Sequence, residues 1–92
     1  MKTINKINKI NELCLEIQNK QLATVFTRYA GHTDQIDITL YPGEWVADYP
    51  EKDIIFITIY CYNQDKTYND LQYFKLVNYL QSILITGIIE KP

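Results

Sequence analysis

The side chains that could carry chemistry are few in this sequence and lie far apart. The chain has one histidine, His32, two cysteines, Cys14 and Cys61, and one arginine, Arg28. A general base needs a pocket and a partner that tunes its pKa, whereas His32 stands beside Asp34 in a Gly-His-Thr-Asp segment typical of a turn. There is no glycine-rich phosphate loop and no HExxH, CxxC or GxSxG motif. We therefore predict a protein that is not an enzyme, with no catalytic residue, no metal ligand and no cofactor.

The two cysteines stand inside apolar patterns, more than forty residues apart. That placement favours buried, inert thiols in a reducing compartment over a disulfide framework or a zinc site. The asparagines and lysines of MKTINKINKINEL interrupt every apolar pair, so no signal peptide or membrane span is predicted there. We expect a cytoplasmic protein that does not bind membranes.

A loop between residues 42 and 53 combines acidic and aromatic side chains. Paired carboxylates could form there, but the pattern is more typical of a solvated acidic loop; its acids are Glu44, Asp48, Glu51 and Asp53. Trp45 and Tyr49 lie among them, and Tyr41 comes just before. Trp and Tyr dominate binding hot spots, so the loop could insert into a basic, aromatic-lined groove of another protein. Alternatively, Trp45 covers the edge of the core. The sequence leaves both open.

The elements that must position these residues are predicted from periodicity. The triplets INK-INK-INE place Ile4, Ile7 and Ile10 on a helical stripe that Leu13, Cys14 and Ile17 continue. Thr3 is the expected N-cap, and residues 19–20 the expected end. A second helix is predicted over about 68–85, with Asp70 near its positive end, Gly87 as its stop and residues 88–89 folding back.

Three strands lie between the helices. Residues 22–30 and 35–41 flank the turn at 31–34, which pairs Ala30 with Gln35 and sets Arg28 opposite Asp37. This register places Val25 and Tyr29 on the apolar side. The run at 53–62 is continuously apolar, which marks it as the central or most buried strand.

Residues 1–92 should therefore form a single α+β domain, with 47% apolar residues for one core. Short connections favour a helix, a three-stranded antiparallel meander and a helix, with both helices on one face of the sheet. The register then predicts which side chains lie on the uncovered face. They are Thr24, Phe26, Arg28, Asp37, Thr39, Tyr41, Phe56, Thr58, Tyr60 and Tyr62.

So many rings on one open face favour a contact surface. The alternative is that Tyr, Phe and Thr are there as good strand formers. The predicted partner-binding residues are Phe26, Arg28, Tyr41, Trp45, Tyr49, Phe56, Tyr60 and Tyr62. The predicted partner is a host protein, with self-association through packed aromatic faces as the second hypothesis.

The net charge and the residues that begin the last helix disfavour a nucleic-acid partner. The formal charge is −2 and the pI about 5.2, so no basic field attracts phosphates. The α-β-β-β-α order and GHTDQIDITLY resemble double-stranded RNA-binding domains, but the last helix begins YNDLQYF, without the lysine cluster with which those domains hold phosphates. The open face could stack single-stranded bases, yet Arg28, almost its only cation, faces Asp37.

A second resemblance covers residues 25–84. Tyr-Ala-Gly-His at 29–32, Ile-Asp-Ile-Thr-Leu-Tyr at 36–41 and Gly-Glu-Trp at 43–45, with the Asn, Lys and Ile richness, look like small accessory proteins of bacteriophages and prophages from low-GC bacteria. The resemblance implies a mobile-element accessory protein, a group that includes anti-CRISPR proteins. Such inhibitors occlude a surface of a host protein and need no catalytic residues.

Overall fold

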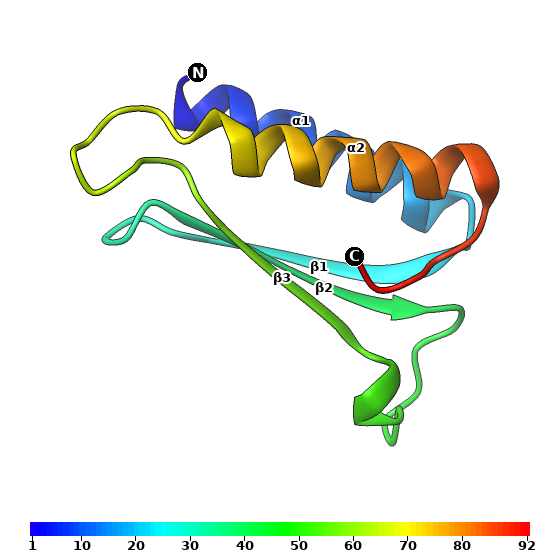
Figure 1. Ribbon diagram of the computed structural model, residues 1–92. Helices are drawn as coiled ribbons and strands as arrows, with labels where there is room; N and C mark the ends of the chain where they lie inside the picture. The colour runs from blue at the N-terminus through cyan, green and yellow to red at the C-terminus, as the bar shows by residue number, and fades with distance from the viewer.

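The computed structural model describes all 92 residues and has the element order α-β-β-β-α. The elements are α1 (Thr3–Asn19), β1 (Ala23–Ala30), β2 (Gln35–Pro42), the 3₁₀ turn η1 (Glu51–Asp53), β3 (Ile55–Tyr60) and α2 (Asp70–Thr86). Both helices lie on the same side of the antiparallel sheet, with α2 in front of α1 (Figure 1). The predicted α+β architecture is confirmed.

The register of the sheet matches the predicted pairing. Ala30 pairs with Gln35 and Arg28 with Asp37 along β1 and β2. The strand order is β1-β2-β3, so β2 is central and β3 is an edge. The interpretation of 53–62 as the central or most buried strand is therefore wrong on both counts. A meander of short connections puts the second strand in the middle, and β2 buries three side chains where β3 buries two. The strand also ends at Tyr60, two residues early.

The core fills the space between the sheet and the helices. Its strand members alternate along β2 and β3, as half-buried strands do; they are Ile36, Ile38, Leu40, Ile55 and Ile59. Both cysteines are buried and free, as predicted. Desolvation by burial raises the pKa of the Cys14 thiol to about 12, so Cys14 stays protonated and inert at neutral pH. Tyr29 is on the helix side of the sheet, as predicted, because it pairs with the buried Ile36, but it is exposed at the end of β1, where its hydroxyl donates to Asp34.

Helix α1 buries the predicted stripe from Ile10 to Ile17, and only its first turn differs from the prediction. Ile4 is 62% exposed, whereas Lys6 is fully buried with 0% exposure. The buried positions of α1 are Lys6, Ile10, Leu13, Cys14 and Ile17, which form one face at helical spacing. The Thr3 prediction is also wrong, because Lys2 is the N-cap residue and no side chain caps this helix.

Helix α2 ends as predicted. Gly87 adopts a left-handed conformation with φ +71°, and its N–H donates to Ile83 O at 2.8 Å. The chain then folds back and Ile89 packs against the core, while Ile88 stays exposed. The helix begins at Asp70 rather than Tyr68, and Asn69 at its N-cap makes no side-chain cap bond. Neither helix has the length and apolar character needed to span a bilayer.

Candidate functional site

The uncovered face of the sheet presents two rows of side chains across the strands. Phe26, Thr39 and Phe56 form one row, because each pairs with the next across the sheet. Arg28, Asp37 and Thr58 form the row beside it. Phe26 is exposed, and Phe56 is 66% exposed. Both helices lie on the other face, so these rings contact solvent (Figure 1).

A shallow hollow of about 510 Å³ lies between the two rows. Phe26 and Phe56 line its apolar side, and Arg28, Asp37 and Thr58 its polar side. A hollow that pairs an apolar wall with a few fixed polar groups suits an inserted side chain of a partner better than a buried small molecule, because it is open along the face.

The polar side of the hollow is ordered around Asp37. Its Oδ1 accepts hydrogen bonds from Gln35 Nε2 and from Thr58 Oγ1, each at 2.8 Å. Arg28 Nε lies 4.0 Å from Oδ2. The bonds from Gln35 and Thr58, with a smaller contribution from the Arg28 charge, hold the pKa of Asp37 below its usual value. Arg28 is the least constrained of these groups, so its guanidinium remains able to bind a partner.

An aromatic chain joins the open face to the loop after β2. Tyr41 is its centre: its ring centroid lies 5.7 Å from Phe26, 6.5 Å from Trp45 and 5.2 Å from Tyr49. All three contacts are edge-to-face, the geometry that aromatic quadrupoles favour. The Tyr49 hydroxyl also donates to Pro42 O at 2.6 Å, which ties the loop to the end of β2.

Trp45 is thereby placed on the open face rather than over the core. It is 47% exposed and is not among the side chains that pack against the core. Of the two interpretations of Trp45, the structure favours the exposed one. Val46, which the sequence reasoning missed, is exposed beside it and extends the apolar area; a lone valine in an acidic loop gives no periodic signal.

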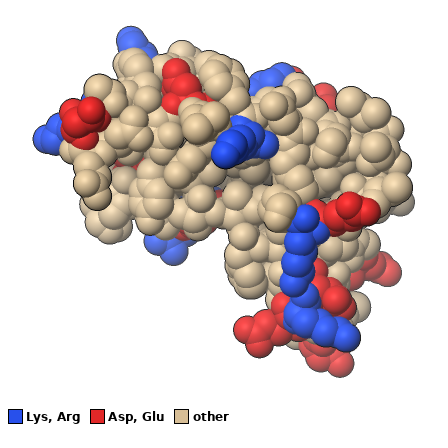
Figure 2. Space-filling view, viewed as in Figure 1, with Lys and Arg blue, Asp and Glu red and all other residues tan.

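The loop forms an acidic lobe that projects below the sheet. Its four acidic side chains and Lys52 are exposed, and their formal charge of −3 exceeds the −2 of the whole chain. Figure 2 shows the carboxylates gathered on this lobe at the lower right, together with basic side chains. Desolvation, with the negative charge of Asp53, raises the pKa of Tyr49, so its hydroxyl remains a hydrogen-bond donor at neutral pH.

The predicted residues fall into two groups. Six of them share one continuous surface, which we call the aromatic surface: Phe26, Arg28, Tyr41, Trp45, Tyr49 and Phe56. Tyr60 is exposed on the same face but at the far end of β3. Tyr62 is not on this face. It lies beyond β3, forms a bridge with Tyr68 and packs partly against the core, because the chain turns there toward α2.

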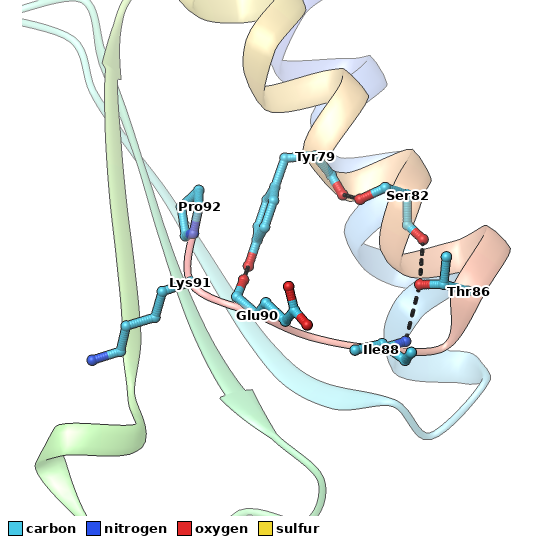
Figure 3. Close-up of a pocket in the computed structure, with 7 residues that line it drawn as sticks. All are labelled: Tyr79, Ser82, Thr86, Ile88, Glu90, Lys91 and Pro92. Carbon is cyan, nitrogen blue, oxygen red and sulfur yellow. Dashed lines mark hydrogen bonds between the residues drawn. The ribbon is translucent and has the colours of Figure 1, made fainter.

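Neither the hollow beside the C-terminal tail nor the turn that carries His32 forms a second site. A hollow of about 310 Å³ between α2 and the tail is lined by bonded groups (Figure 3). There the Tyr79 hydroxyl donates to Glu90 O at 2.6 Å, and Thr86 Oγ1 accepts from the Ile88 N–H at 3.1 Å. His32 is exposed in its turn, and no three His, Cys, Asp or Glu side chains gather as metal ligands would.

No protein-family model, curated protein or solved structure matches this chain.

Proposed function

We propose that the protein acts by binding another protein through the aromatic surface. The observation that carries this proposal is the unbroken chain of ring contacts from Phe26 through the half-buried Tyr41 to Trp45, whose two end rings are exposed. Exposed aromatic area of this kind favours a docking role, since Trp, Tyr and Arg supply most binding hot spots. Arg28 lies at the border of the same surface.

The charge of the lobe indicates the chemistry of the partner. Trp45 and Val46 lie among exposed carboxylates that outnumber the single loop lysine. A partner that offers an apolar pocket for Trp45, bordered by Lys or Arg, matches this pattern in both polarity and charge. Such charge pairs accelerate association, and salt should slow it.

The resemblance to phage and prophage accessory proteins supports a more specific proposal. The partner is a host protein, encountered in the cytoplasm of the host cell, and binding inhibits it by covering its surface, as anti-CRISPR proteins do. This mode needs no reactive group. A single-stranded nucleic acid is the weaker alternative, because Arg28 is the one cation on the open face and the adjacent lobe is acidic.

The test is a comparison of binding by paired variants. The immobilised protein captures partners from lysates of low-GC bacteria, and each captured protein is then purified and titrated directly. The double variant W45A/F56S should weaken its affinity at least a hundredfold, since two hot-spot residues contribute about 2 kcal/mol or more each. The control I85S removes an isoleucine that is 84% exposed on α2, on the other side of the molecule.

Equal losses in both variants, or none in W45A/F56S, contradict the proposal. If the wild-type protein captures no other protein but binds a labelled single-stranded oligonucleotide, more tightly at low salt than at high salt, the nucleic-acid alternative is favoured instead. Circular dichroism of each variant checks that the fold is intact.

A further inference from the structure

The outer edge of β3 is a second exposed feature of the sheet. β2 is central, so β1 and β3 each have one row of backbone groups that faces no strand. The Cys61 N–H donates to Asp34 O at 2.8 Å, and therefore odd-numbered residues of this strand face β2. The backbone N–H and C=O groups of successive residues point to opposite sides of a strand. The groups of Phe56, Thr58 and Tyr60 therefore point outward, away from β2.

The two edges differ in how they are protected. At the β1 edge, Gln18 Oε1 accepts from the Val25 N–H at 3.1 Å and Asn11 Oδ1 accepts from Thr27 Oγ1 at 2.9 Å, so α1 covers it. At the β3 edge the only such contact is Gln72 Oε1, which accepts from the Tyr60 N–H at 2.9 Å. The outward groups of the other two residues have no bonding partner.

The sequence of β3 adds no protection of its own. The strand is IFITIY, without a charge or a proline, two of the features by which edge strands avoid pairing. An apolar groove of about 270 Å³ separates it from α2, lined by Ile57, Ile59, Leu76 and Tyr79 among others. The groove keeps the edge accessible from the helix side.

We propose that the β3 edge binds the β3 edge of a second copy of this chain, antiparallel, around a two-fold axis at Thr58. A second copy is the expected partner because the β3 edge is complementary to itself in an antiparallel arrangement. With Thr58 opposite the partner's Thr58, Phe56 lies opposite the partner's Tyr60, and every outward backbone group meets another. Thr–Thr and aromatic pairs are favourable across strands, and Ile57 then lies opposite the partner's Ile59. No strand residue is charged, so two copies do not repel each other there.

One free edge per copy gives a closed dimer rather than a filament. The product is a six-stranded sheet whose open faces lie on the same side, so both aromatic surfaces stay accessible and this inference does not depend on the proposed function. Three groups beside this edge must move. Gln72 releases the Tyr60 N–H, and Lys91 Nζ, which donates to Lys52 O just before the strand, swings aside. The adjoining Pro92, which lines the groove, moves with Lys91. Lys75, the one charge that lines the groove, is exposed and can turn to solvent.

The test uses matched substitutions at the two edges. T58P removes an outward N–H that the monomer does not use, and T27P does the same at the β1 edge. Each substitution also removes one side-chain hydrogen bond of the monomer, from Thr58 to Asp37 or from Thr27 to Asn11, so the two variants are matched in that loss. Sedimentation over a concentration series should show a dimer for the wild type and T27P, with the dimer dissociation constant of T58P raised about tenfold or more, as lost hydrogen bonds imply. T39K, on the central strand of the open face, should leave this dimer intact.

A cross-link gives an independent readout. Cα atoms of directly bonded pairs lie about 5.5 Å apart, within the range that a disulfide spans. T58C should therefore form a disulfide dimer on mild oxidation, while T39C should not; Cys14 and Cys61 are buried and do not compete. A monomer at every concentration, or a dimer that T39K abolishes and T58P leaves, overturns the proposal. The latter result assigns self-association to the open face instead. A finding that no β3 dimer forms does not contradict the proposed function, which needs only the aromatic surface.

Discussion

Replacement of Lys6 by methionine should destabilise the fold more than any other single change on α1 that preserves side-chain volume. Lys6 Nζ donates to Cys61 O at 2.9 Å and to Asn69 O at 3.3 Å, and lies 3.1 Å from Asp70 Oδ1. Nζ also lies 5.8 Å from the centre of the Tyr68 ring. These acceptors belong to the segment that connects β3 to α2, so one buried ammonium fastens that segment to α1.

The size of the stability loss follows from the groups that lose their partner when the Lys6 ammonium is removed. Methionine keeps most of the apolar stem of Lys6, so little cavity forms, but two carbonyls lose their donor. A buried acceptor without a partner costs about 1–3 kcal/mol, and breaking a buried ion pair about 3–5 kcal/mol. Asp70 keeps the N-terminal ammonium at 3.1 Å and is partly exposed, which places K6M near the lower limit, about 3 kcal/mol.

Such a loss is a large fraction of the total stability of a small domain, which is about 5–15 kcal/mol. For a chain of this size it corresponds to a fall in Tm of roughly 12–24 °C. Urea and thermal unfolding followed by circular dichroism measure both quantities. The control is K9M, since Lys9 is partly exposed and only approaches Glu12 at 3.8 Å; it should change stability by less than about 0.5 kcal/mol. If K6M and K9M unfold at the same urea concentration and the same temperature, the Lys6 contacts do not hold the segment between β3 and α2 in place.

Two further predictions concern acid stability and the end of α2. Partial desolvation opposes ionisation of Asp70, but the hydrogen bonds and charges of Lys6 and the N-terminus outweigh it and hold its pKa below the usual value. A depressed folded-state pKa stabilises the fold fully above the unfolded value of about 4, and this contribution is lost as the pH falls through the folded pKa. Urea titrations from pH 6 to 2 should show that D70N flattens the decline below pH 4; an unchanged decline excludes Asp70 as its source. G87A should cost about 1 kcal/mol because alanine is strained at φ +71°, whereas G31A, whose added Cβ meets only ordinary contact, should cost less in the same unfolding assay.

Local pattern was sufficient to predict the elements and the register. The alternation of Ile36, Ile38 and Leu40 fixes which face of β2 is buried, and the turn at 31–34 fixes which residues of β1 oppose it. A shift by one residue would expose that apolar set, so register and face are decided together. The same reasoning correctly placed Phe26 and Phe56 on the open face and Gly87 at the end of α2.

The extent of the candidate site was only partly predictable. Tyr62 continues the alternation of Phe56 and Tyr60, so nothing local shows that the chain leaves the sheet at Cys61. Trp45 had two possible environments, and its position against Tyr41 depends on the path of a loop with no periodicity. The exposed edge of β3 was equally hidden, because a continuously apolar strand can be central or peripheral.

The sequence by itself determined the two helices, the three strands and their pairing, because these follow from spacings of two to four residues. Only the tertiary structure decided which residue of the first turn of α1 is buried. Ile4 and Lys6 both continue helical stripes toward Ile10, and hydrophobicity alone favours Ile4. Lys6 is nevertheless the buried one, because oxygens of Cys61, Asn69 and Asp70, more than fifty residues away in sequence, surround its ammonium and replace water.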